Sequence, residues 1–306
     1  MIASLILLKR GSLWGRIVRT TEEALRTGSQ LPVPTDYEFI EDAGMRFFVR
    51  VLSSLRHKDD DLQKQRESSA SGKKTTNPFL PYDKALYVAD ISDSHVALLN
   101  KFNVVKHHLL IITRHFESQD SLLTLGDFEA LWTCMTEYNS LGFYNGGEEA
   151  GASQAHKHLQ VVPLPLAPEG PETPIDPLLD NAYFQAGSGT VPGLPFLHSF
   201  ERLEDDAKAS PLQIAEESFR LYGSMLNQVG LPTPDTEGAE IPSKPYCLLV
   251  TRKWMLLVPR SKEFFDSISI NSLGFAGALL VRDSQQLALL KSYGPMEALK
   301  SVALSV

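Results

Sequence analysis

Apolar and polar residues recur along the chain with two periods, which predict two kinds of element. Alternation at every second residue, with β-branched residues, predicts strands. Such stretches lie at residues 37–39, 45–52, 95–102, 108–113, 246–251 and 254–259. Apolar residues three or four apart predict helices. These lie at residues 5–26, 127–141, 211–229 and 284–306, the last with a break at Gly294-Pro295.

One further strand pattern carries chemistry. His156, His158 and Gln160 occupy every second position, and the residues that follow His158 and Gln160 are apolar. Side chains two apart share one face of a strand, whereas a helix would turn His158 away from the other two. A β-branched pair and then Pro163 complete the strand. We therefore expect two imidazoles and one amide on a single sheet face.

A run of small and polar residues, Gly151-Ala152-Ser153-Gln154, precedes this strand. Its backbone can approach a ligand closely, and successive N–H groups in such a turn can form an anion-binding concavity. A neutral imidazole is a nucleophile near pH 7 and can hold a transferred group covalently. The combination indicates phosphoryl-type transfer. The alternatives are two ordinary buried histidines or half of a metal site.

The pattern His156-x-His158-x-Gln160 resembles the signature of the nucleotidyl transferases of the HIT superfamily. The ten residues from Gly151 to Gln160 resemble the corresponding run of the diadenosine tetraphosphate (Ap4A) phosphorylases, also called ATP adenylyltransferases. The similarity extends from about residue 46 to residue 282. It implies that His158 takes AMP from Ap4A and that phosphate accepts the AMP. The products would be ADP and ATP, and His156 would orient the site.

The resemblance also implies a set of substrate contacts. They are Lys58, Asn100, Lys101, Asn145, Gly151, Ala152, Ser153, Gln154, Gln160, Asn271, Ser272, Leu273, Ala278 and Arg282. The Asn100-Lys101 pair matches the position that holds the ribose in HIT proteins. Lys58 and Arg282 would neutralise the polyphosphate, although a solvated lysine is the alternative for Lys58, which lies in a densely charged stretch.

Three local expectations accompany that set. Asn271 or Ser272 can cap a helix, whose N-terminus would favour an anion. Asp127 can cap the helix predicted at 127–141. His107 and His108 lack the motif context of the family, and we interpret them as structural.

Gln160 favours transfer over hydrolysis. HIT hydrolases usually have a histidine at this position, which can pass a proton to a poor leaving group. Glutamine cannot titrate and can only donate or accept hydrogen bonds. A HIT-type hydrolase and a catalytically silent nucleotide-binding protein remain the alternative functions.

Composition sets further limits. The net charge of −8 argues against general nucleic-acid binding but leaves room for a local positive pocket. Cys134 and Cys247 stand far apart, which disfavours a thiolate zinc site and the related hexose-1-phosphate uridylyltransferases. We expect both thiols to be buried. We also expect a divalent cation, Mg²⁺, carried by the polyphosphate, with no metal held directly by the protein.

The short apolar N-terminus lacks the features of a signal peptide, and no stretch is long enough to span a bilayer. We therefore expect a cytoplasmic monomer that binds nucleotides (Ap4A, ATP, ADP and AMP) and phosphate. The expected fold class is α+β, a mostly antiparallel HIT-like sheet with flanking helices, formed from two degenerate HIT-like halves. Residues 1–165 would carry the nucleophile, 166–245 a Pro/Gly-rich connection with one amphipathic helix, and 246–306 the hairpin and helices that complete the site.

Overall fold

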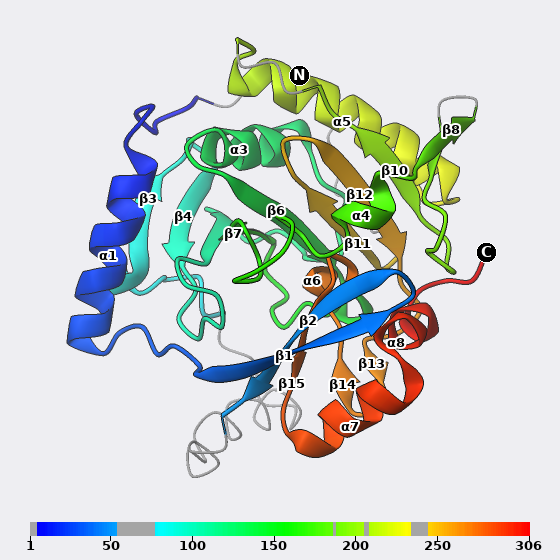
Figure 1. The fold of residues 1–306 in the computed structure, drawn as a ribbon. Coiled ribbons are helices and arrows are strands. Elements are labelled where there is room, and N and C mark those ends of the chain that lie inside the picture. Colours follow the sequence, from blue (N-terminus) through cyan, green and yellow to red (C-terminus); the bar gives the residue numbers. More distant parts are fainter. Residues whose placement is uncertain (1–4, 54–76, 186–187, 205–207, 234–243) are drawn as a thin grey trace.

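A large, mostly antiparallel sheet organises the chain in the computed structural model, which describes residues 5–53, 77–185, 188–204, 208–233 and 244–306. Within these residues the sheet has ten strands in the order β3-β4-β5-β7-β6-β11-β12-β10-β9-β8 (Figure 1). The bounds are β3 Tyr87–Asp90, β4 His95–Leu99, β5 Leu109–Thr113, β6 Ser140–Gly146, β7 His158–Pro163, β8 Tyr183–Gln185, β9 Ser188–Thr190, β10 Ser199–Arg202, β11 Tyr246–Val250 and β12 Trp254–Pro259. The expected α+β class with a mostly antiparallel sheet is confirmed.

Helices cover one face of this sheet. They are α1 Leu13–Thr27, α3 Leu125–Met135 and α5 Pro211–Gln228. Their buried apolar residues, among them Ile17, Phe128 and Tyr222, pack in one cluster with residues of the sheet such as Leu159 and Val161. The helix α5 begins at Pro211, as the sequence predicts, and the structure adds Ser210 as its capping residue.

A second layer packs against the other face. It contains a three-stranded sheet, β1 Thr35–Asp42, β2 Met45–Leu52 and β15 Ala278–Val281. Around it lie the strands β13 Phe264–Phe265 and β14 Ile268–Ser269 and the helices α4 Asp176–Leu179, α6 Ser272–Phe275, α7 Ser284–Tyr293 and α8 Pro295–Val302. The short 3-10 turns η2 Lys84–Leu86 and η3 Glu148–Ala150 complete the elements. The predicted break at Gly294-Pro295 separates α7 from α8, so that prediction is confirmed.

Three expected helices are wrong in part. Residues 5–12 are not helical, and Ile6 instead forms a bridge with Ser92. The helix predicted at 127–141 ends at Met135, because residues from Ser140 onward enter the centre of the sheet as β6. Its N-cap is Thr124, and Asp127 is the third helical residue, reciprocally bonded to that cap.

The stretch 271–282 is also not one helix. Asn271 does cap α6, but this helix is a single turn, and the chain continues into β15. Gly277 adopts a positive φ of 88° between the two, which lets the backbone turn from helix to strand. The Pro-rich stretch after β7, in which the sequence predicts no strands, contributes β8 and β9 to the edge of the large sheet.

No helix within the described ranges is both long and apolar enough to cross a membrane. Both cysteines are buried free thiols, as expected.

Candidate active site

The strand β7 places the histidine motif at the start of its pairing with β5. His158 and Gln160 lie on the face opposite Leu159 and Val161, which belong to the core beneath the helices. His156 precedes the strand and is held by a bridge to Ser118. The ring of Phe79 packs against His156 and His158, with centroid distances of 5.6 and 5.4 Å. Both imidazoles therefore border the same space, as the alternation predicts.

Hydrogen bonds occupy both ring nitrogens of His156. Its Nε2 lies 2.9 Å from the carbonyl oxygen of Thr113 and 2.9 Å from the Thr113 hydroxyl. The amide of Asn77 lies 2.9 Å from its Nδ1. Nε2–H therefore donates to Thr113, and Nδ1 accepts from Asn77. Burial lowers the pKa of His156, which favours this neutral form. His156 has no lone pair left for attack.

His158 has the opposite arrangement. Its Nδ1 donates to the backbone carbonyl oxygen of His156 at 2.9 Å. Nε2 therefore carries the lone pair, and it has no hydrogen-bond partner among the described residues. Burial lowers the pKa of His158 to about 4, so the ring is neutral at pH 7. The motif thus presents one oriented, unprotonated nitrogen.

Gln119, which the sequence analysis missed, fixes the backbone of His158. Its Oε1 accepts the N–H of His158 at 2.8 Å, and its Nε2 donates to the carbonyls of Asn145 and His158. Gln119 is buried and joins β7 to the end of β6, beyond the last paired residues of the two strands. No sequence motif marks such a residue, because its partners are backbone atoms.

Asn145 links the two informative stretches of the sequence. Its side-chain oxygen accepts hydrogen bonds from the N–H of Ser272 at 2.9 Å and from the Ser272 hydroxyl at 2.6 Å. The side-chain NH₂ of Asn145 has no partner among the described residues and can donate to a ligand. This link brings the stretch around residue 272 to the end of β6, close to the start of β7.

Gly151 makes a second contact between these two stretches, against Asn271. Its φ is +89°, and a Cβ at this position would lie 2.8 Å from the Cβ of Asn271 and 3.0 Å from its Cα. Glycine is therefore required for both the backbone conformation and the contact. The small-residue turn that includes Ala152, Ser153 and Gln154 thus lies against the residue that caps α6.

Asn100 follows β4 and is joined to His108. Its Nδ2 lies 3.3 Å from Nδ1 of His108, and the N–H of Asn100 donates to the His108 carbonyl. Burial lowers the pKa of His108 to about 4. The register of β5 and β7 pairs Leu110 with Gln160, which places His108 diagonally across from Gln160 on the same face. His108 therefore contributes to the site face, although its sequence context gave no sign of this.

The remaining expected residues are dispersed. Lys101 is half-buried, with Nζ 5.6 Å from the ring centre of Phe102. Leu273 and Ala278 are half-buried in the second layer. Arg282 is exposed at the end of β15, and its side chain makes no hydrogen bond or ion pair with another described residue. Lys58 lies outside the described residues.

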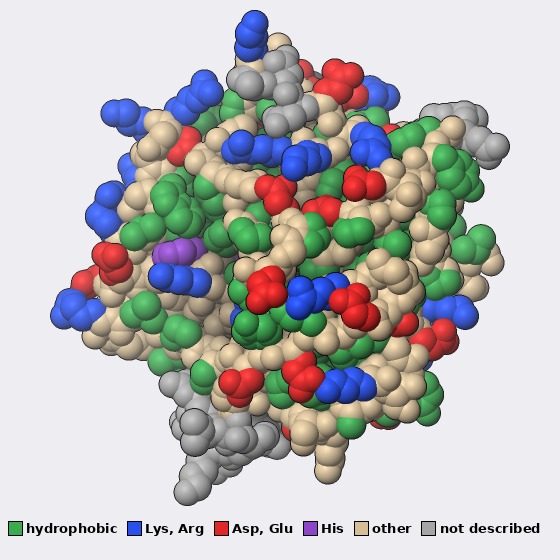
Figure 2. Space-filling view, in the orientation of Figure 1, with side chains coloured by type: hydrophobic (Ala, Val, Ile, Leu, Met, Phe, Trp, Pro, Cys, Tyr) green, Lys and Arg blue, Asp and Glu red, His purple; other side chains and the backbone are tan. Residues whose placement is uncertain are grey.

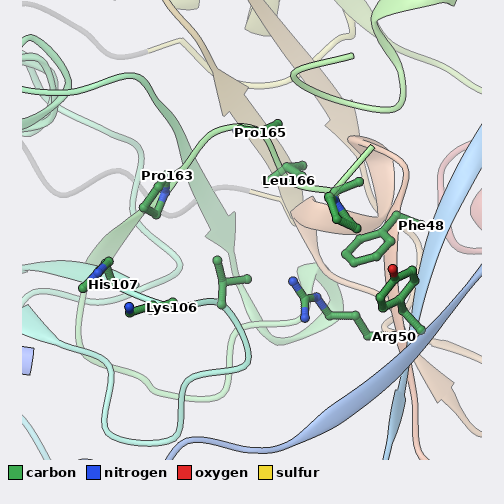
Figure 3. Close-up of a pocket in the computed structure, with 11 residues that line it drawn as sticks. Phe48, Arg50, Lys106, His107, Pro163, Pro165 and Leu166 are labelled. Atoms are coloured by element: carbon green, nitrogen blue, oxygen red, sulfur yellow. The ribbon is translucent and has the colours of Figure 1, made fainter. Parts of the chain in front are cut away.

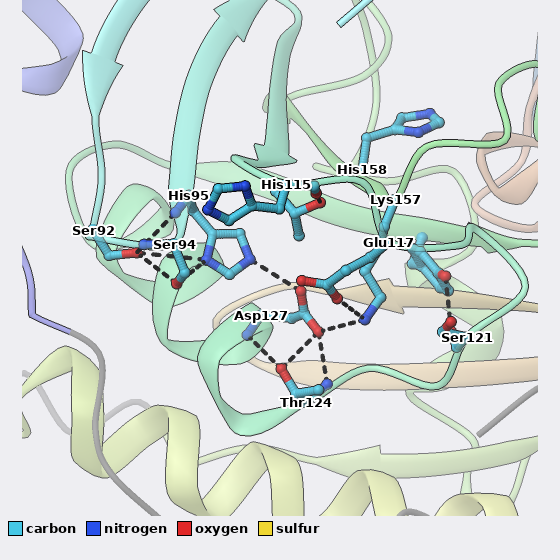
Figure 4. A network of polar contacts seen from close by, with 12 residues as sticks. Ser92, Ser94, His95, His115, Glu117, Ser121, Thr124, Asp127, Lys157 and His158 are labelled. Carbon is cyan, nitrogen blue, oxygen red and sulfur yellow. Dashed lines mark hydrogen bonds and ion pairs between the residues drawn. The ribbon is translucent and has the colours of Figure 1, made fainter. Parts of the chain in front are cut away.

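A charge network lies on the side of β7 opposite His158 (Figure 4). Lys157 Nζ forms ion pairs with Asp127 at 3.1 Å and Glu117 at 3.0 Å, and Asp127 also accepts from His95. Burial alone would raise the pKa of Asp127, but Lys157 and His95 hold it well below its usual range. In Figure 4 the side chains of Lys157 and His158 point in opposite directions from the strand. The network fixes the backbone between the two motif histidines.

Acidic and basic side chains are interspersed over the face shown in Figure 2. No single-sign field covers this face. Attraction for an anionic ligand therefore depends on a few cationic side chains and on directed N–H groups.

Solved structures of a yeast protein have a similar fold. Yeast Ap4A phosphorylase Apa2, solved in complex with Ap4A, has a TM-score of 0.74 at 23% identity, with 98% of this chain and 99% of that chain covered. Its AMP complex gives the same TM-score and identity, with 98% of each chain covered. These matches show the fold.

Sequence comparison gives the family. A family model described as the Ap4A phosphorylase N-terminal domain matches residues 3–181, and one described as the ATP adenylyltransferase C-terminal domain matches residues 192–305. Diadenosine 5′,5‴-P1,P4-tetraphosphate phosphorylase 2 of Saccharomyces cerevisiae is 30% identical over 264 residues, which are 79% of this chain and 78% of the yeast protein. Protein APA1 of the same yeast is 29% identical over 210 residues, 61% of each chain.

Fold, site and family models together define a nucleotidyltransferase of the ATP adenylyltransferase class. Within that class, the chain belongs to the Ap4A phosphorylase family.

The contact between Gly151 and Asn271 gives a first prediction. In Gly151→Ala the new Cβ has to push the small-residue turn away from Asn271. A displacement of about 1 Å near reacting atoms costs up to about 100-fold in rate, so we expect a loss of Ap4A turnover approaching that size. Gly170→Ala is the matched control, because Gly170 has a φ of +100° but no atom near its Cβ position. Equal losses in both variants would attribute the effect to backbone strain alone.

The buried ion pairs give a second prediction. Lys157→Met leaves Asp127 buried with one cationic partner fewer, and we expect the free energy of unfolding to fall by about 3–5 kcal/mol. Lys300→Met removes an exposed pair with Glu297 and should cost less than about 1 kcal/mol. Urea unfolding followed by fluorescence measures both. A loss in Lys157→Met as small as that of the control would mean that the network contributes little to stability.

The buried imidazoles give a third prediction, on pH. Because the folded-state pKa of His158 and of His108 is about 4 and that of an unfolded histidine is about 6.5, the unfolded chain binds more protons between these values. Their contribution to stability is thus complete above pH 6.5 and is lost as the pH falls toward 4. NMR titration of the His158 ring, assigned with His158→Gln, should give a midpoint near 4. A midpoint near 6.5 would indicate a solvated ring.

Proposed function

We propose that the protein catalyses the phosphorolysis of Ap4A, in which Ap4A and phosphate give ADP and ATP through an AMP-histidine intermediate on His158. The observation that supports this most directly is the hydrogen bond from Nδ1 of His158 to the carbonyl of His156, which leaves Nε2 as the free nucleophile. Membership of the Ap4A phosphorylase family supports the reaction itself.

In the first step, Nε2 of His158 attacks the phosphorus next to one adenosine. The new N–P bond forms as the bond from that phosphorus to the bridging oxygen breaks, and ATP leaves. The imidazole becomes positively charged, and its Nδ1–H remains on the His156 carbonyl, which stabilises that charge. ATP is a weak base, so its departure does not require an acidic side chain at position 160.

In the second step, an oxygen of inorganic phosphate attacks the same phosphorus. The N–P bond breaks, ADP forms, and the neutral imidazole is restored with its proton still on Nδ1. We propose that the amides of Asn145 and Gln160, with the N–H groups around Ser153 and Gln154, hold the oxygens on which negative charge develops. Lys58 and Arg282 would neutralise the outer phosphates.

We further propose that Mg²⁺ accompanies the polyphosphate. Among the described residues, no three His, Cys, Asp or Glu side chains gather as a metal site, so the phosphate oxygens would supply the contacts. A cytoplasmic, monomeric enzyme is part of the same proposal, and the two buried free thiols are typical of a reducing compartment.

The test combines product analysis with two histidine variants. With Ap4A, Mg²⁺ and phosphate, the protein should form ADP and ATP in equal amounts, and ADP formation should require phosphate. His158→Ala should abolish turnover while folding is retained. His198→Ala is the matched control, because His198 also has Nδ1 at 2.8 Å from the carbonyl two residues earlier but lies outside the site. It should retain normal rates.

Labelled AMP trapped on the protein in single-turnover experiments without phosphate would establish the intermediate. Near-normal rates in His158→Ala would show that another group is the nucleophile. Release of free AMP, independent of phosphate, would favour the hydrolase instead. Binding of Ap4A without turnover or trapped AMP would favour a silent nucleotide-binding protein.

A further inference from the structure

A buried arginine, Arg260, connects the two stretches that meet at the candidate site. It directly follows β12, and 3% of its surface is exposed. Its backbone N–H donates to the carbonyl of Pro245 at 2.8 Å, and its backbone also forms a bridge with Ala303 near the C-terminus. The residue before β11 and the residue after α8 thus fix the point from which the side chain extends.

The guanidinium of Arg260 donates to the carbonyls that directly precede Gly151 and Asn271. Nη1 donates to the carbonyl of Ala150 at 3.2 Å, and Nη2 donates to the carbonyl of Ile270 at 2.8 Å. A peptide unit is planar, so holding a carbonyl also fixes the N–H of the residue that follows it. One side chain therefore sets the peptide planes on both sides of the contact between Gly151 and Asn271.

The remaining donors of this guanidinium are also used inside the protein. Nε donates to the carbonyl of Val302 at 3.1 Å, Nη1 to Sγ of Cys247 at 3.1 Å, and Nη2 to the carbonyl of Lys262 at 2.9 Å. An arginine has five N–H donors, so none remains for a ligand. Arg260 therefore acts through the groups that it holds and not by contact with the substrate.

Arg50 shows the contrasting arrangement. It lines a cavity of about 440 Å³ between the β1–β2 hairpin and the proline-rich segment 163–168, at the end of β7 distant from His158. In Figure 3 its guanidinium extends from β2 into the space between these walls. Its one hydrogen bond to another described residue is to the Thr35 hydroxyl, so donors remain for water or a ligand. Arg260, by contrast, is buried and has every donor occupied.

The charge of Arg260 is costly to bury. It forms no ion pair with a carboxylate in the part of the chain that the structure describes, and carbonyl dipoles surround it instead. The guanidinium carbon also lies 5.2 Å from the ring centre of Phe275 in α6. An apolar side chain of similar size would avoid the cost of a buried charge. It could not hold two peptide planes, whereas a planar fork of donors can.

Backbone N–H groups without partners lie on both stretches that Arg260 holds. Those of Ser153, Gln154 and Asn271 have no hydrogen-bond partner among the described residues. Ser153 is exposed, and Gln154 and Asn271 are half-buried, so a ligand can reach them. Such N–H groups can donate to phosphate oxygens. Their relative position depends on the contact that Arg260 fixes.

We propose that Arg260 is a positioning residue for the transfer of the nucleotide. It holds the small-residue turn and the cap of α6 in the relative position in which their N–H groups surround the transferred phosphate. The arginine lies in the part matched by the C-terminal family model, whereas the turn lies in the N-terminal part. This inference rests on the proposed function, because it assumes that the turn binds that phosphate.

The test compares AMP with adenosine, which differ only in the phosphate. Calorimetric titration measures both affinities in the wild type, in Arg260→Met and in Arg260→Lys. Lysine keeps the charge, but its single ammonium group cannot replace the planar fork. Both variants should weaken AMP binding about tenfold or more, the effect of losing a hydrogen bond to a charged group, and leave adenosine binding within about twofold.

Arg252→Met is the matched control. Arg252 lies at the turn of the same hairpin, β11–β12, and its Nη2 donates to the carbonyl of Met135 at 2.8 Å, away from the site. This variant should leave both affinities unchanged. Urea unfolding establishes that each variant is folded at the temperature of the titration, and Arg260→Lys, which retains the buried charge, decides the question if Arg260→Met does not fold.

Normal AMP affinity in Arg260→Lys would show that the charge matters and the held peptide planes do not, which would overturn the inference. Equal losses for AMP and adenosine would indicate a general loss of structure and would overturn it as well. In the reaction, both variants should lower kcat/KM for Ap4A by about 10- to 100-fold. Because binding needs no turnover, the titrations are independent of whether the wild type forms ADP and ATP, which tests the proposed function.

Discussion

The hydrogen bond from Nδ1 of His158 to the carbonyl of His156 is the constraint on which the proposed mechanism depends. An imidazole has two nitrogens, and the proposed attack requires that Nε2 carries the lone pair. A backbone carbonyl can only accept, so it fixes the proton on Nδ1 without taking it. His156 can hold that carbonyl in place because Thr113 and Asn77 occupy both of its own nitrogens. His156 thus serves to orient His158.

The second requirement is that two distant stretches of the chain meet. Asn145 at the end of β6 accepts two hydrogen bonds from Ser272, and Gly151 lies against Asn271. These contacts cross the boundary between the parts matched by the two family models. The residues of the candidate site therefore come from both parts. The pairing of β6 with β11 at the centre of the large sheet makes this meeting possible, because it joins strands of both parts into one sheet.

The sequence predicted those features that repeat locally. The histidine strand, the hairpin of β11 and β12 and the capped helix α5 have periodic patterns and clear ends, and the structure contains them. The errors arose where tertiary packing decides. Residues near Leu141 have helical spacing, but they form the strand β6 at the centre of the sheet. No sequence pattern indicated that Gln119 and His108 belong to the site. Gln119 bonds to backbone atoms, and His108 becomes a neighbour of Gln160 only through the strand register.

The ionic groups near β7 pair with one another, and the two motif histidines are neutral. The chain is acidic overall, and the ion pairs around Lys157 are satisfied internally on the far side of β7. That lysine therefore offers little attraction to a polyphosphate. The motif histidines are neutral, because burial lowers the pKa of both. On the proposed mechanism, the attraction for a polyphosphate comes from oriented amides and from cations such as Arg282, whose side chain forms no ion pair with another described residue. A positively charged His158 would bind phosphate better, but it could not attack it, so neutrality at this position favours transfer at the expense of simple binding.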